Sequence, residues 1–148
     1  MSDAGSAVEL RLSGSISELA ELSTLPEKVP AGRPVILDTG EVESINSLGV
    51  RDWVGFVRAL CERSPQVTIR RLSPPLVIQA NAIYDFLSRA RVESFICAWE
   101  CTKCGNWHET LHALHEDPGK NLACPKCGSP MAFWDLEEGY LSFRSAAK

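Results

Sequence analysis

The sequence lacks a basic excess, a long apolar run and any low-complexity tract. Its 148 residues include 15 lysines and arginines against 19 aspartates and glutamates, a net charge of −4 at pH 7. Nucleic acids and anionic membranes attract basic surfaces, so this charge counts against a general binder of either kind. No apolar run approaches the roughly 20 residues of a membrane-spanning helix, so we predict no membrane span. Residues 1–6 are polar and show no secretory signal, which indicates a cytoplasmic protein.

The apolar content is sufficient for a core, because 45% of the residues are hydrophobic. Apolar and polar residues alternate near the start, and short apolar runs bounded by turn residues recur along the chain. Helical spacing of apolar residues follows Gly49 and again follows Ser73, where a capping residue precedes proline. Strands are thus predicted at 7–13, 35–37, 66–72 and 92–99, with helices at 50–61 and from 73 onward. Strands alternating with helices predict an α/β fold.

The N-terminal part is organised around residues 34–61. They are predicted to form a buried strand, a tight polar loop and an amphipathic helix. The loop begins at the turn-prone residues 38–40, and Asp38, Glu41 and Glu43 near it are expected to be surface carboxylates. Asn46 and Ser47 stand at the start of the helix. Free backbone N–H groups and the helix dipole favour an oxygen-rich side chain or an anion there.

Composition changes at Glu100, beyond which Cys, Gly, Pro and aromatic residues are dense. We therefore predict two domains, 1–99 and 100–148, the second too poor in apolar residues to fold without a staple. Two matching CxxCG turns supply a candidate staple. Two residues between the thiols let both sulfurs reach one ion, and the following glycine suits the tight turn. The candidate metal ligands are Cys101, Cys104, Cys124 and Cys127.

Four thiolates predict a structural zinc site with one Zn²⁺ per chain, since two disulfides would need an oxidising compartment. Iron is the alternative metal, because paired CxxCG turns also resemble rubredoxin, where four thiolates hold one iron. A complete tetrahedral set of thiolates leaves no position for a substrate water. We therefore expect no catalysis by this metal.

Histidine and aromatic residues in the C-terminal part show weaker patterns. The histidines are expected to be solvated loop residues, with a second metal site or a replaced thiolate ligand as the alternative. The aromatic residues are expected to form the core of the ribbon, with a base-stacking platform as the alternative. A further hairpin is predicted from residues 131–134 and 140–143. The residues concerned are His108, His112, His115, Trp107, Phe133, Trp134 and Tyr140.

Four landmarks in residues 1–99 resemble the STAS domain, the family of bacterial anti-sigma-factor antagonists and related signalling modules. LSGSI at 12–16 resembles the exit of an early strand in that family. A strand at 35–38 followed by INSLGV at 45–50 resembles its signature of strand, loop and hydrophobic-Asp-Ser-(Ser/Ala)-Gly-hydrophobic. LSP at 72–74 resembles a later strand-to-helix junction, and residues 92–99 match the closing strand.

The resemblance implies a STAS-like mixed β-sheet with helices mainly on one face, joined here to a small zinc ribbon. It also implies switching by protein–protein interaction, in which a partner kinase phosphorylates the serine that corresponds to Ser47. Asn46 replaces the family's aspartate in this chain, and Gly49 matches the signature glycine. The alternative role is structural, with Asn46 and Ser47 capping the helix and Gly49 allowing close packing.

The expected function is therefore a non-catalytic signalling or scaffold module with a protein partner, such as an anti-sigma-type kinase or a signalling complex. STAS modules that act as scaffolds or dimerisation units add a homodimer to these expectations. The alternative function is a transcription-associated adaptor whose ribbon binds nucleic acid or the transcription machinery, although the acidic balance disfavours nucleic acid. No nucleophile–base pair, phosphate-binding loop or open metal site is apparent, so we expect no enzymatic activity.

Overall fold

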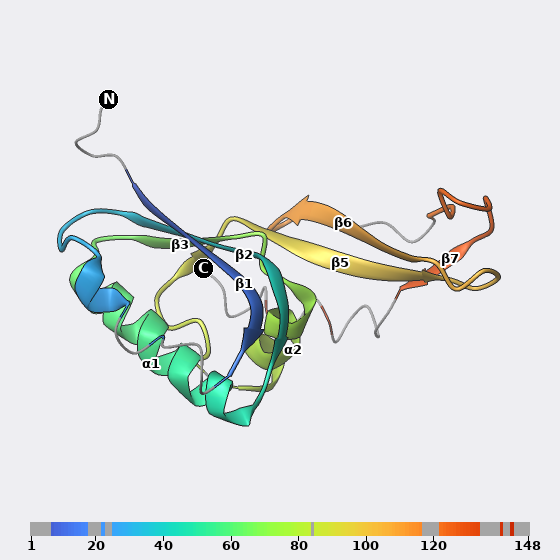
Figure 1. The fold of residues 1–148 in the computed structure, drawn as a ribbon. Coiled ribbons are helices and arrows are strands. Elements are labelled where there is room, and N and C mark those ends of the chain that lie inside the picture. Colours follow the sequence, from blue (N-terminus) through green and yellow to red (C-terminus); the bar gives the residue numbers. More distant parts are fainter. Residues whose placement is uncertain are drawn as a thin grey trace.

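A computed structural model of the chain describes residues 7–17, 22, 25–83, 85–116, 122–133, 140 and 143. Its described part is α/β, with a parallel four-stranded sheet, two α-helices and a small antiparallel three-stranded sheet (Figure 1). No helix among these residues is long and apolar enough to cross a membrane. The α/β class predicted from the alternating pattern is therefore confirmed.

The first sheet contains β1 (Val8–Ile16), β2 (Val35–Ile45), β3 (Val67–Arg70) and β4 (Arg91–Val92) in that order. Every pair of neighbours is parallel, so the mixed pairing that the STAS resemblance implies is not seen among these described strands. Helices α1 (Ser47–Arg63) and α2 (Pro74–Ala82) lie on the same side of the sheet (Figure 1). A short 3-10 helix, η2 (Pro26–Lys28), precedes β2.

The core lies between this sheet and the two helices. Leu37 and Ile69 point into it and are fully buried. On the opposite face of the sheet, the guanidinium of Arg70 contacts the carboxylates of Glu9 and Glu93 at 3.5 and 3.0 Å. From α1, Trp53 stacks on Phe86 with the ring centroids 5.5 Å apart, and its indole N–H donates to the Phe86 carbonyl. The predicted amphipathic helix thus packs by its apolar face.

The strands β1 and β2 are longer than the sequence patterns predict. Strand β1 continues through Gly14, where an end was predicted, and β2 continues through the predicted loop to Ile45. Asp38 pairs with Arg11 but Glu41 pairs with Ser13, so β2 carries an extra residue in a β-bulge there. The loop predicted to begin at residues 38–40 is wrong as far as Ile45, because pairing with β1 keeps this segment extended, and the turn into α1 comes at Asn46.

The chain changes sheets at Glu93. Strand β4 ends at Val92, and β5 (Ser94–Cys101) then pairs with β6 (Trp107–Ala113) and β7 (Met131–Phe133) in the order β6-β5-β7, antiparallel throughout. The closing strand predicted at 92–99 is present but interrupted at Glu93, and its second part still forms a parallel bridge between Phe95 and Leu72. Strand β5 also runs past residue 99, so the predicted domain boundary falls inside one strand.

Two residues near the C-terminus lie against the first half of β5. The Tyr140 hydroxyl donates to the Ile96 carbonyl, and the Asn81 amide of α2 donates to the Tyr140 carbonyl at 2.9 Å. Phe143 contacts Phe95 edge-on with a centroid distance of 5.4 Å. Tyr140 is helical and Phe143 lies in a 3-10 turn, so a strand through these two positions is wrong. The other residues of that hairpin beyond 133, including Trp134, lie outside the described residues.

Candidate functional site

Two CxxCG turns form the loops at the far end of the second sheet. In the first, Gly105 N–H donates to the Cys101 carbonyl at 3.2 Å, and in the second, Gly128 N–H donates to the Cys124 carbonyl at 2.8 Å. Both glycines have positive φ, 75° and 80°, a conformation that costs little only without a β-carbon. The repeated sequence therefore produces the same turn twice. Each turn directs its pair of thiols toward the other turn.

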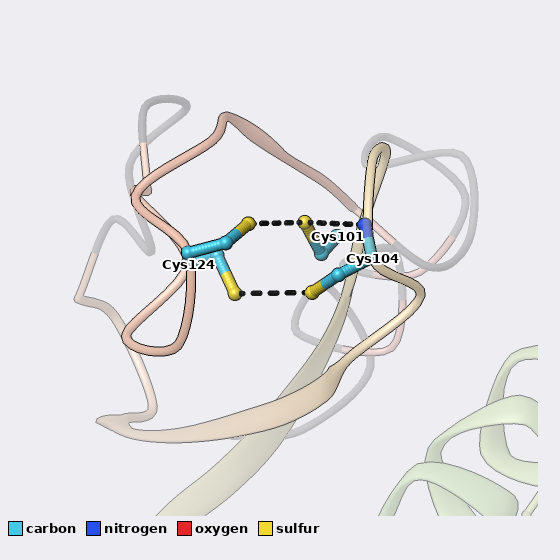
Figure 2. Close-up of side chains that lie close together, drawn as sticks. Cys101, Cys104 and Cys124 are labelled. Carbon is cyan, nitrogen blue, oxygen red and sulfur yellow. Dashed lines mark hydrogen bonds between the residues drawn. The ribbon is translucent and has the colours of Figure 1, made fainter.

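The four cysteine sulfurs lie together between these turns (Figure 2). Sulfur atoms of opposite turns approach to 3.4 Å (Cys101–Cys127) and 3.8 Å (Cys104–Cys124), and all four lie within 4.8 Å of one another. These separations exceed the roughly 2.05 Å of a disulfide. They bracket the ~3.8 Å expected between sulfurs on a tetrahedron with metal–sulfur bonds of about 2.3 Å. The cluster has the composition and size of a four-thiolate metal site.

Backbone donors stabilise negative charge in this cluster. The N–H groups of Cys104 and Lys103 point at the Cys101 sulfur from 3.3 and 3.4 Å, and they lower the pKa of Cys101 to about 6. The N–H of Asn106 lowers the pKa of Cys104, but the neighbouring Cys101 sulfur and burial outweigh it and raise this pKa to about 11. The first thiolate thus opposes formation of the second, and a divalent cation bound between them would remove that repulsion.

The three histidines do not join this cluster in the described structure. His112 is buried in β6, contrary to the predicted solvated loop position. Its Nδ1 lies 3.1 Å from Glu116 and its Nε2 lies 2.7 Å from the Thr110 hydroxyl, which accepts from the Trp99 indole. The hydrogen bond from His112 lowers the pKa of Glu116. This chain of hydrogen bonds joins β6 to β5 and assigns His112 a structural role.

Trp107 and Tyr140, the two of these aromatic residues whose side chains the structure describes, do not share a core in the predicted ribbon. Trp107 on β6 is 47% exposed, whereas the sequence prediction placed it inside. Tyr140 is fully buried but packs beside α2 and the first half of β5. Strand β7 ends at Phe133, and Trp134 lies outside the described residues.

Residues 46–49 form the start of α1. The Asn46 side chain accepts from Gly49 N–H at 2.7 Å, which makes Asn46 the N-cap, as the structural alternative predicted. Ser47 is exposed at the first helical position, and Leu48 beside it is 42% exposed. Gly49 is buried, and a β-carbon there would lie 2.2 Å from the Ile16 carbonyl oxygen. Gly49 therefore lets α1 pack closely on the end of β1, and the polar residues Asn46 and Ser47 are both exposed.

Of the three carboxylates that were expected on the surface, only two lie there. Glu41 and Glu43 are exposed, but Asp38 is buried and accepts from the Arg71 guanidinium at 2.9 Å and from Gly40 N–H at 3.0 Å. Sequence reasoning missed this ion pair, because 33 residues separate its members. It also missed the His112–Glu116 contact, since a spacing of four residues makes neighbours on a helix and His112 lies on a strand.

Comparison with known proteins finds no match. No protein-family model, no curated protein and no solved structure matches this chain. Its function must therefore be inferred from its own residues and their geometry.

Proposed function

We propose that the chain is a non-catalytic cytoplasmic signalling or scaffold module, a STAS-like domain joined to a structural zinc ribbon. The fold supports this proposal in one respect, since both helices lie on one side of the first sheet (Figure 1). The strand–helix step from β2 into α1 also supports it, since the STAS-like signature falls at that point. In this proposal the ribbon provides stability, and the start of α1 meets a protein partner.

Zinc is the proposed metal, with one ion per chain. All four donors are cysteine sulfurs, a set that suits Zn²⁺ and also iron. Four thiolates complete the tetrahedral shell of zinc, so no position would remain for a substrate or an activated water. A bound ion would hold the loops after β5 and before β7 together. Its proposed role is therefore structural.

The exposure of Ser47 and Leu48 at the N-terminus of α1 is the observation that carries the interaction proposal. Leu48 is one of three large hydrophobic side chains exposed in the described part of the chain. A solvent-facing leucine beside a hydroxyl offers both an apolar contact and a group that a kinase can modify. Trp53 further along α1 is fully buried, so it is not part of the proposed surface.

Phosphorylation of Ser47 is the proposed switch. A phosphate would add nearly two negative charges beside the free N–H groups of the first helical turn, where the dipole of α1 favours an anion. The modified chain should therefore stay folded. An apolar or acidic partner surface seated on Leu48 would meet the new charge and lose affinity.

Phosphorylation and partner capture test this function. Purified chain is incubated with bacterial lysate and ATP, and phosphoserine is mapped by mass spectrometry, with modification expected at Ser47.

Immobilised chain should capture a partner protein from the lysate. The Ser47→Asp and Leu48→Ala variants should retain at least about fivefold less of that partner. The matched control Leu111→Ala removes another exposed leucine, 55% exposed on β6, and should capture as the parent does. Equal capture by all four chains, with Ser47 unmodified, would exclude this surface.

A further inference from the structure

A groove of about 960 Å³ lies where the second half of β2, the start of α2 and the start of β6 meet. Val42, Pro74 and Ile78 supply apolar lining, and Trp107 lines it from the second sheet. Ligand sites in proteins commonly occupy about 300–1,000 Å³ and combine an apolar surface with a few polar groups. The groove has that size and that composition. Ser47 and Leu48 are not among its described lining residues.

The charged side chains among the described lining residues of the groove are all negative. Glu41 and Glu43 line it from β2 and Glu109 lines it from β6, and its described lining includes no lysine or arginine. Within the described residues, no salt bridge involves any of these three glutamates. The closest guanidinium to Gly40, that of Arg71, is held by the buried Asp38. Three carboxylates around an apolar floor therefore leave a negative potential that a bound cation would neutralise.

Trp107 adds a second feature that suits a cation. Its side chain is nearly half exposed beside the carboxylates, and its indole N–H points to Glu109 at 3.4 Å. The face of an indole ring attracts ammonium and guanidinium groups, and tryptophan binds them best among the aromatic residues. An aromatic face and carboxylates on one groove are complementary to a lysine or arginine side chain.

The backbone of β2 is irregular where it lines the groove. Its register against β1 shifts between Asp38 and Glu41 and again between Val42 and Ser44, so β2 carries two additional residues over this segment. Such bulges redirect side chains and are frequent next to binding sites. The second bulge contains Glu43. Along this segment Glu41 and Glu43 are both exposed while Val42 between them is buried.

We propose that this groove binds an extended, lysine- or arginine-containing segment of a partner protein. Glu41 and Glu43 meet basic side chains along the segment, and Trp107 with Glu109 holds a further one. The phosphates of a nucleic acid are repelled by the same carboxylates. This site is distinct from the Ser47 surface, so it does not depend on the proposed switch.

Binding of a defined basic peptide tests the site. A fluorescein-labelled octapeptide of alternating lysine and alanine is titrated with the full chain at 150 mM salt, with fluorescence anisotropy as the readout. We expect saturable binding that weakens with added salt and is absent for the octapeptide with glutamate in place of lysine. The double variant Glu41→Gln/Glu43→Gln should bind at least about threefold more weakly. Trp107→Leu should also bind about two- to fivefold more weakly, because it removes the cation–π contact.

A matched control separates this groove from the overall acidity of the chain. Glu27→Gln/Glu62→Gln removes two exposed glutamates outside the groove and changes the net charge equally. This variant should bind as the parent does. An equal loss of affinity in it, no loss in the groove variants, or no peptide binding at all would overturn the proposal. Unchanged zinc content and circular dichroism of each variant establish that the fold is intact.

Discussion

At the scale of single residues, Gly49 determines how closely α1 approaches β1. Its N–H completes the Asn46 cap, and its missing side chain leaves room for the Ile16 carbonyl. That carbonyl also accepts from Asn46 N–H at 3.1 Å. Helix α1 therefore cannot move away from the end of β1 without loss of the hydrogen bond between Asn46 N–H and the Ile16 carbonyl. The signature glycine has a sufficient physical explanation without any partner.

A Gly49→Ala variant should accordingly be destabilised by about 1–3 kcal/mol, the usual cost of forcing an extra carbon into a packed site. Urea unfolding followed by fluorescence measures the free energy of unfolding. Gly55→Ala on the same helix is the matched control, because a β-carbon there meets nothing within 4 Å. Helix propensity predicts that the control gains about 0.5–1 kcal/mol. Similar effects at both positions would contradict the packing explanation.

At the scale of elements, local patterns predicted most helices and strands, but not where the strands end. The cap of α1, the proline start of α2 and the paired cysteines follow from nearby residues, and the structure contains each of them. Strand β2 extends through its pairing with β1, and the guanidinium of Arg71, 33 residues away, binds the turn-prone Asp38. The interruption between β4 and β5 falls at Glu93, whose N–H still donates to the Ile69 carbonyl of β3. Contacts between distant residues are not visible in a local pattern.

Metal removal tests whether an ion bound by the four cysteines orders the loops that carry them. We expect the purified chain to release about one zinc ion per chain to a chelator, measured by a colorimetric zinc assay. Hydrogen exchange should then accelerate in the loops around Cys101 and Cys124, because few apolar contacts remain to order them. Cys104→Ser should lose zinc, whereas Cys61→Ser, a buried cysteine outside the cluster, should keep it. Iron in place of zinc would change the metal assignment, and unchanged exchange after chelation would refute the structural role.

At the scale of the whole molecule, two observations connect the predicted domains 1–99 and 100–148. Strand β5 belongs to both, running from Ser94 beside the parallel sheet to the candidate metal ligand Cys101. Tyr140 and Phe143 return to the same strand and are buried there. A chain cut at residue 99 would expose the apolar surface around Phe95. We infer that the residues before 100 depend on the C-terminal segment for part of their core.

Phe143→Ala tests this dependence without altering the candidate metal site. Phe143 is 2% exposed, and replacing a buried phenylalanine with alanine typically costs about 3–5 kcal/mol. If both parts share one core, the loss appears in the unfolding of the N-terminal part, reported by exchange protection of β2 and α1. Zinc content should stay the same, because Phe143 contacts Phe95 at the opposite end of β5 from Cys101. Leu111→Ala, at an exposed position, should change stability by less than about 0.5 kcal/mol. Unchanged protection of β2 and α1 in Phe143→Ala would instead show that the N-terminal part folds independently.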